Sequence, residues 1–239
     1  SIWKLLKNEE FQNIKKIYLT ASGGPFLNKK ISQIKNAKPK YALKHPNWRM
    51  GKKISIDSAT MMNKVFEVIE AANIFNLNVS KFGIIIHPKS YIHAIIHFKN
   101  GLTKLLAHET NMEIPIFNSL FFNNNKIIYN NKDFDFIRLN GSNFIKPNIS
   151  KFPLLKLLNN KFNNTYYEII LLSINDELVQ KYLNNEINYI SIQRLLLKFT
   201  KDPYFKKYYK YRPNNINDIK TMVKKVINYL NKYLDYNDK

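Results

Sequence analysis

The chain has 239 residues, a mass of 28.3 kDa, a formal net charge of +21 and no cysteine. The lack of cysteine excludes disulfides, thiolate zinc sites and cysteine nucleophiles, and a hydrophobic share of 45% argues against disorder. No apolar run approaches the roughly 18 residues of a membrane span, and no hydrophobic signal segment is present, so we expect a soluble, intracellular chain. Because it starts at Ser1 and enters an apolar segment at once, we also expect that a front part has been removed.

The positive charge has two explanations. The basic residues are 34 lysines and only four arginines. A basic domain is the electrostatic footprint of nucleic-acid binding, yet readers of phosphates and bases favour arginine for its bidentate geometry. Lysine, asparagine and isoleucine are abundant here and have AT-rich codons, so genome composition explains the surface as well. We favour genome composition and keep a basic nucleic-acid-binding module as the alternative.

The first half of the chain alternates strand and helix patterns. Ser58 is the expected N-cap of a helix over residues 59–75, whose apolar side chains recur at helical spacing. Asn100-Gly101 is a strong two-residue hairpin signal. These elements predict a mixed β-sheet with helices packed on it. The strands are expected at residues 16–20, 53–57, 82–86, 91–98 and 102–107.

The second half of the chain has helical patterns. Thr165 and Glu168 form a capping box at the start of one expected helix. Ser191 is the expected cap of a second helix, and the apolar stripe of a third begins at Ile219. We therefore expect an α+β fold in three parts. These are a mixed-sheet domain at residues 1–132, a linker at 133–152 and a small C-terminal helical bundle at 153–239.

The densest set of polar side chains runs from Ser58 to Glu67. If a helix starts near Ala59, its free N–H groups and the positive end of its dipole favour an anion beside Ser58. Asn63, Lys64 and Glu67 occupy neighbouring positions on the expected helix. The set suits a phosphorylated substrate beside a hard cation, with Lys64 on the phosphate and Glu67 on the metal. The alternative is a capped surface helix with a Lys–Glu ion pair, which spacing alone favours.

Two loops are further candidates for ligand binding. Ser22-Gly23-Gly24 follows a strand and can bring backbone N–H groups to a phosphate, although such a loop is also common without a ligand. The sequence contains neither GxGxxG nor a Walker A motif. Trp48 and Met50 lie in a loop, residues 45–51, that lacks core periodicity. This pattern indicates either a lid over a ligand or a loop docked on the core.

His93 and His97 lie on one face of an expected strand, and His87 and His108 lie nearby in sequence. Two histidines on one face suit a metal pair. No third ligand is evident in the pattern. Histidines that are hydrogen-bonded within the sheet are therefore the favoured interpretation.

Several segments, taken in order, carry a resemblance to a known family. They are Ser22-Gly23-Gly24-Pro25-Phe26, His45-Pro46-Asn47-Trp48-x-Met50-Gly51-x-Lys53-Ile54-Ser55, Asp57-Ser58-Ala59-Thr60-Met61-Met62-Asn63-Lys64, Glu67, Ile69-Glu70, His87-Pro88-x-Ser90-x-Ile92-His93, and Met112 with Pro115-Ile116. Together they resemble the 1-deoxy-D-xylulose 5-phosphate reductoisomerase family. The resemblance covers residues 1–130 well and the helical tail only by pattern, and its run from His45 to Glu67 is long and nearly gap-free.

The resemblance implies a reaction and its cofactors. In this family the substrate, coordinated to Mg²⁺ or Mn²⁺, is isomerised by breaking and remaking a C–C bond. NADPH then reduces the resulting aldehyde to 2-C-methyl-D-erythritol 4-phosphate, an isoprenoid precursor of the non-mevalonate pathway. The resemblance also implies a homodimer with a phosphorylated sugar substrate and no nucleic-acid or membrane partner. The expected location is the cytoplasm of a bacterium with an AT-rich genome, with a plastid as the alternative.

The resemblance assigns roles to individual residues. Glu67, His45 and Lys64 are the expected catalytic residues of the sheet domain. The other implied roles are phosphate binding by Ser22, Ser58, Asn63 and Lys64, metal binding by Glu67, closure of a lid by His45 and Trp48, lining of the site by His93, and approach to the nicotinamide by Gly23, Met50 and Met112.

The chain departs from the family pattern in two ways. The family's nucleotide-binding domain and acidic metal-binding motif both lie upstream of Ser1, and Glu67 alone does not complete a Mg²⁺ site. Val65 replaces the family's usual glycine after Lys64, and residues 173–177 follow the tail motif only loosely. We therefore expect the chain by itself to be inactive. A decayed fragment that acts only as a structural partner is a further alternative.

Overall fold

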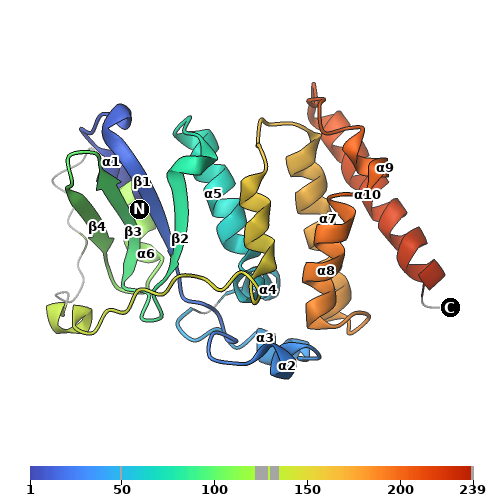
Figure 1. The fold of residues 1–239 in the computed structure, drawn as a ribbon, viewed down its shortest axis with the longest axis horizontal. Coiled ribbons are helices and arrows are strands. Elements are labelled where there is room, and N and C mark those ends of the chain that lie inside the picture. The colour runs from blue at the N-terminus through green and yellow to red at the C-terminus, as the bar shows by residue number, and fades with distance from the viewer. Residues whose placement is uncertain (49, 122–128, 130–134, 238–239) are drawn as a thin grey trace. The chain divides into compact units, whose positions relative to one another are not determined.

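The computed structural model describes residues 1–48, 50–121, 129 and 135–237. Its chain forms two compact units, whose elements are labelled in Figure 1. We call them the sheet unit and the helical unit. The sheet unit comprises residues 1–24, 46–49 and 64–148, and the helical unit comprises residues 25–45, 50–63 and 149–239.

A four-stranded mixed sheet in the order β2-β1-β3-β4 forms the sheet unit. The strand β1 pairs with β2 in parallel and with β3 antiparallel, and β3 pairs antiparallel with the edge strand β4. Ile14, Ile17 and Ile96 of the two central strands are fully buried. The strands are β1 (Ile14–Ala21), β2 (Phe82–Ile86), β3 (Ile92–Phe98) and β4 (Thr103–Ala107).

The hairpin predicted at Asn100-Gly101 is confirmed. Gly101 adopts a φ of +89°, which favours glycine because a side chain would be strained there. The Asn100 side chain accepts a hydrogen bond from the backbone N–H of Leu102 at 3.0 Å, and the Phe98 N–H donates to the Leu102 carbonyl at 2.9 Å. The predicted strands at 16–20 and 82–86 are likewise confirmed.

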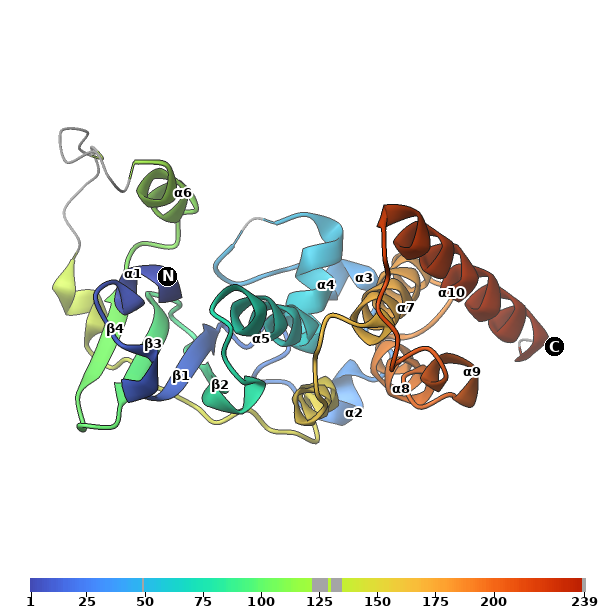
Figure 2. The same cartoon turned by 90° about the horizontal axis from the view of Figure 1, so that it is seen from above.

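Helices cover the sheet within this unit. The short helix α1 contacts β3 and β4, and Figures 1 and 2 show α5 alongside β2. The apolar side chains of Val65, Val68 and Ile69 on α5 are buried, as the periodicity predicts. The helical segments that contribute to this unit are α1 (Ile2–Leu6), α5 (Met62–Ile74, from Lys64 onward), α6 (Glu113–Leu120) and the 3₁₀ turns Phe11–Asn13, Val79–Lys81 and Phe136–Leu139.

The helical unit is organised around α7, which contacts α4, α8 and α10. Ile170, Ile174 and Leu178 form the buried stripe of α7, and each is 0% exposed. None of the helices in the described ranges is both long enough and apolar enough to cross a membrane. The elements are α2 (Ile31–Ile34), α3 (Pro39–Ala42), α4 (Lys52–Thr60), α7 (Tyr166–Leu183), α8 (Tyr189–Phe199), α9 (Pro203–Lys206), α10 (Ile216–Asn237) and a 3₁₀ segment, Pro153–Asn159.

Of the two helix caps predicted in the second half of the chain, one is correct. The capping box of Thr165 and Glu168 is present at the start of α7, where the Thr165 N–H donates to Glu168 Oε2 at 3.0 Å. The predicted cap at Ser191 is wrong, because α8 starts earlier and is capped by Asn188. The Asn188 side chain accepts the backbone N–H of Ser191 at 3.0 Å. Asparagine and serine are both strong caps, so the sequence offered two adjacent starts.

The strand predicted at residues 53–57 is wrong, since this segment is part of α4. Its alternation of Ile54 and Ile56 imitates a strand, but the helix buries Ile56 completely and leaves Ile54 39% exposed. Lys53 and Asp57 lie one helical turn apart and form an ion pair at 2.7 Å. The Asn175 side chain on α7 donates a second hydrogen bond to Asp57 at 2.8 Å, so tertiary contacts favour the helix.

The single helix predicted over residues 59–75 is instead the end of one helix, α4, followed by a second, α5. Met61 has a left-handed φ of +64° and ends α4 before α5 begins at Met62. The Thr60 hydroxyl donates to the Ile56 carbonyl at 3.1 Å, a back-bond that favours a helix end. Ser58 therefore lies in the last turn of α4 and caps no helix start, so the positive end of a helix dipole does not lie beside it. The phosphate role of Ser58 then rests on the family resemblance.

The α+β fold class is confirmed, but the compact units differ from the expected domains. Residues 25–45 and 50–63 belong to the same compact unit as the C-terminal helices. One cause is the buried tyrosine Tyr189, whose hydroxyl donates to the Ala59 carbonyl at 2.7 Å. A hydroxyl buried in this way needs a partner, and α4 supplies one because its carbonyls are released where the helix ends.

The expected linker also takes part in the fold. Its residues 135–148 belong to the sheet unit. Ile145 forms an antiparallel bridge with Ile86, and their N–H and carbonyl groups exchange two hydrogen bonds of 2.8 Å. Residues 133 and 134 lie outside the described residues. The bridge is invisible in the local pattern because it joins positions far apart in sequence.

We expect Tyr189→Phe to lower the free energy of unfolding by about 1–2 kcal/mol, because it leaves the buried Ala59 carbonyl without its donor. Tyr211→Phe is the matched control, since Tyr211 is 53% exposed. Urea denaturation followed by circular dichroism measures both variants. Equal stability of Tyr189→Phe and the parent chain would show that the hydrogen bond contributes nothing.

Candidate functional site

The strongest candidate group lies on α5. Lys64 Nζ is 2.7 Å from both carboxylate oxygens of Glu67, one helical turn along. The side chains of Lys64 and Glu67 are 19% and 32% exposed, so the pair is partly buried. The Lys–Glu pair of the simpler interpretation is therefore present, but it does not lie on an open surface. At this distance the ammonium and the carboxylate form a charge-assisted hydrogen bond.

The loop after β1 adopts the conformation that its glycines allow. Gly23 and Gly24 have φ values of +89° and +68°, which favour glycine. The Ser22 hydroxyl accepts the Gly24 N–H at 3.1 Å. Because β1 and β2 are parallel, this loop lies at the same sheet edge as His87, whose N–H donates to the Ala21 carbonyl at 2.7 Å. Loops at the carboxyl ends of parallel strands are frequent ligand sites.

Residues 47 and 48 are docked on the sheet unit. The Asn47 amide donates to the Pro88 carbonyl at 2.7 Å and to the Ser90 hydroxyl at 2.8 Å. Trp48 meets the ring of His93 edge-on, with ring centroids 6.1 Å apart. Of the two predicted interpretations of this loop, the docked one describes these two residues. Asn47 and Ser90 stand in the matched motifs, but the sequence assigned them no role because neither residue type is distinctive in a loop.

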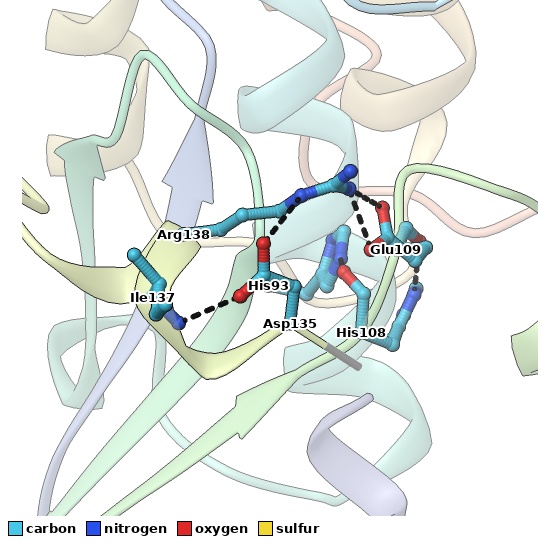
Figure 3. Close-up of polar contacts among 6 residues, drawn as sticks. All are labelled: His93, His108, Glu109, Asp135, Ile137 and Arg138. Atoms are coloured by element: carbon cyan, nitrogen blue, oxygen red, sulfur yellow. Dashed lines mark hydrogen bonds and ion pairs between the residues drawn. The ribbon is translucent and has the colours of Figure 1, made fainter. Parts of the chain in front are cut away.

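His93 lies in a stacked pair with His108, shown in Figure 3, with ring centroids 3.7 Å apart. Burial, together with the neighbouring charges of His108 and Lys64, lowers the pKa of His93 to about 4, so the ring is neutral at pH 7. His97 instead pairs with the Thr103 hydroxyl at 3.0 Å. The favoured interpretation of sheet histidines with hydrogen-bond partners is confirmed for His93 and His97.

The described acidic and histidine side chains do not form a complete metal site. Within the described ranges no group of three or more His, Asp or Glu side chains is placed to hold a metal ion. Glu67 supplies one carboxylate of the hard oxygen type that Mg²⁺ takes. It fits as a single ligand and does not make a complete site with other described residues.

The candidate residues are divided between the two units. Contacts bring Lys64 to Glu67 and Trp48 to His93. Met112 precedes α6 and is 56% exposed. The sheet unit contains Ser22, Gly23, Trp48, Lys64, Glu67, His93 and Met112, and the helical unit contains His45, Met50, Ser58 and Asn63.

The lowered pKa of His93 predicts unfolding in mild acid. An unfolded histidine has a pKa near 6.5, so between pH 6.5 and 4 the unfolded chain binds a proton that folded His93 does not bind. This group should therefore reduce the free energy of unfolding by about 3 kcal/mol as the pH falls from 6.5 to 4.

Urea denaturation across that pH range measures the effect. His93→Gln is expected to flatten the pH dependence, and His97→Gln controls for the loss of a histidine from the same strand. Parallel curves for His93→Gln and the parent chain would contradict the expectation.

Two family models match the chain. Residues 1–75 match the 1-deoxy-D-xylulose 5-phosphate reductoisomerase C-terminal domain, and residues 108–229 match the DXP reductoisomerase C-terminal domain. The second match alone spans more than half of the chain. Both agree with the resemblance drawn from the motifs.

Related proteins and structures agree with the models. The chain is 52% identical over 223 residues to the reductoisomerase of Pelagibacter ubique (93% of this chain, 57% of the relative) and 36% identical over 229 residues to that of a Sulfurihydrogenibium species (95% and 60%). It thus spans somewhat under two thirds of their length.

Solved structures show the same similarity. A crystal structure of DOX-P reductoisomerase in complex with NADPH, fosmidomycin and magnesium has a TM-score of 0.86 and 32% identity, covering 98% of this chain and 59% of that one. The structure of the Zymomonas mobilis reductoisomerase in complex with NADPH has a TM-score of 0.81 and 26% sequence identity. The match covers 96% of this chain and 59% of that one. Because a family model matches more than half of this chain, the chain belongs to the 1-deoxy-D-xylulose 5-phosphate reductoisomerase family.

Proposed function

We propose that the protein to which this chain belongs converts 1-deoxy-D-xylulose 5-phosphate to 2-C-methyl-D-erythritol 4-phosphate with NADPH. The observation that carries the proposal is the family match over residues 1–75 and 108–229, together with the partly buried Lys64–Glu67 pair within the matched part. Relatives named as reductoisomerases and a structure holding NADPH and magnesium support it. None of these comparisons supports the alternative of a nucleic-acid-binding module.

Lys64 and Glu67 on α5 are the residues that we assign to the phosphate and to the metal ion. Without ligands, Lys64 and Glu67 neutralise each other at 2.7 Å. We assign Lys64 to the substrate phosphate, together with Ser22, Ser58 and Asn63, and Glu67 to the divalent cation. Phosphate binding far from the reacting carbons supplies energy for orienting them.

Glu67 would be one ligand of the cation, Mg²⁺ or Mn²⁺, with the others supplied from outside the described residues or by the substrate. When bound, such a cation polarises the carbonyl and hydroxyl oxygens of the substrate. Lys64 contacts both oxygens of the Glu67 carboxylate, so its ammonium has to move from them to the phosphate before the cation can bind there.

Other residues would shape the space around the reacting carbons. We assign Trp48 and His45 to a lid that excludes water, and His93 to the wall of the site. Trp48 already lies against His93, which supports a shared role. Gly23, Met50 and Met112 are assigned to the nicotinamide end of NADPH. The absence of side-chain bulk at Gly23 and the left-handed conformation there suit close approach of a cofactor.

A homodimer in the cytoplasm of a bacterium is part of the proposal, with a plastid as the alternative compartment. Leu105 on the edge strand β4 is 49% exposed, and Leu102, which directly precedes this strand, is 65% exposed. An edge strand with exposed apolar side chains favours pairing with another chain. The bacterial origin of the relatives supports the compartment.

The whole protein is expected to oxidise NADPH when 1-deoxy-D-xylulose 5-phosphate and Mg²⁺ are both supplied. Absorbance of NADPH follows turnover, and omission of the substrate, or addition of a chelator, is the control. No oxidation by the folded whole protein with either Mg²⁺ or Mn²⁺ would overturn the proposed function.

Lys64→Ala in the whole protein is expected to raise the Kd for the substrate about 10- to 150-fold, the range for losing a hydrogen bond to a charged group. Lys52→Ala is the control, because Lys52 is an exposed lysine at the start of α4. Titration calorimetry measures both variants. Equal affinities in the two variants would show that Lys64 does not bind the phosphate.

A further inference from the structure

His93 occupies an irregular position in the sheet. Ile92 pairs with Ala107 and Ala94 pairs with Leu106, so β3 has one residue more than β4 at this point. His93 is that extra residue, so it has no directly paired residue on β4. Its ring faces His108, which directly follows β4, with the two rings 15° from parallel. Figure 3 shows the two rings beside the loop that carries Glu109.

The hydrogen bonds define the proton positions on both rings. His93 Nε2 lies 3.0 Å from the main-chain carbonyl oxygen of His108. A carbonyl only accepts, so Nε2 carries the proton and Nδ1 holds a bare lone pair. His108 Nδ1 similarly donates to the Glu109 carbonyl at 2.6 Å. No hydrogen bond from a residue within the described ranges reaches His93 Nδ1, which therefore remains an acceptor for a ligand.

The segment that carries His108 is held by Arg138. Its Nη1 donates to both carboxylate oxygens of Glu109 at 2.8 and 2.9 Å, and its Nε lies 3.5 Å from Asp135. The guanidinium also lies over the ring of Tyr91, 5.7 Å from its centroid. Because Tyr91 directly precedes β3, Arg138 ties the segment after β4 to the start of β3, as Figure 3 shows in part. Arg138 therefore restrains the main chain directly next to His108.

We propose that His108 is a positioning residue, whose ring holds the His93 ring in one orientation so that Nδ1 accepts a hydrogen bond from a hydroxyl group of the polyol phosphate substrate. The identity of the substrate rests on the proposed function. A half-turn of the His93 ring would place a C–H where Nδ1 now lies and break the bond to the His108 carbonyl. The stacked ring of His108 lies against one face of His93, so a half-turn would also have to break this ring contact.

Imidazole ¹⁵N NMR of the chain without any ligand tests the positioning. The parent chain is expected to show His93 as a single Nε2–H tautomer, with well-separated signals for its two nitrogens, and His93→Gln assigns these signals. His108→Ala keeps the main-chain acceptor but removes the ring, so we expect the separation to be lost through averaging. His108→Phe restores a flat ring and should restore the separation.

Further controls distinguish positioning from general damage. His97→Ala removes a strand histidine outside the stacked pair and should leave the His93 signals unchanged. In the whole protein, His108→Ala should lower kcat/KM about tenfold and His108→Phe should recover most of it. Averaged His93 signals in the parent chain, or separate signals in His108→Ala, would overturn the proposal. The NMR readout needs no turnover, so failure of the proposed function in the NADPH assay is recognised separately.

Discussion

The pairing of β1 with strands on both sides is the constraint on which the sheet unit depends. β1 joins β2 in parallel and β3 antiparallel, and its Ile14 and Ile17 are fully buried. The Thr20 hydroxyl, itself buried, donates to the Ile92 carbonyl at 2.6 Å where the regular ladder between β1 and β3 has ended. The strand β1 also sets the position and direction of the loop at Ser22, because this loop begins directly after Ala21, the last residue of β1. Removing β1 would release both neighbours, whereas β4 pairs with β3 alone.

The helical unit depends on a different device, the placement of polar groups inside an apolar bundle. Tyr182 and Tyr189 bury their rings and donate their hydroxyls to the carbonyls of Ala37 and Ala59, each at 2.7 Å. Burial raises the pKa of Asp57, while Lys53 and the Asn175 amide hold its charged form. Buried polar groups stabilise only the arrangement that satisfies them. These contacts therefore select the packing of the N-terminal segments against the C-terminal helices.

Most of the positive charge of the chain has no part in the proposed ligand binding. Of the 34 lysines, Lys64 alone is placed by the proposal at a ligand, and its carboxylate partner lies on the same helix. Lys53 has a structural role between Asp57 and Asp176. Arg138, one of only four arginines, ties three segments of the sheet unit because its planar fork serves two carboxylates and an aromatic face at once.

The sequence by itself determined the features that depend on near neighbours. The Asn100-Gly101 hairpin, the capping box at Thr165 and the strand at residues 82–86 all follow from local patterns, and the motif run from His45 to Glu67 identified the family. Only the tertiary structure decided the helix at residues 53–57, the break at Met61 and the meeting of His93 with His108. The physical reason is range. A hairpin or a cap is stabilised by hydrogen bonds within a few residues. The Ala59 carbonyl at the end of α4 is instead bonded by Tyr189, 130 residues away. His93, in the bulge of β3, meets His108 only because β3 and β4 pair.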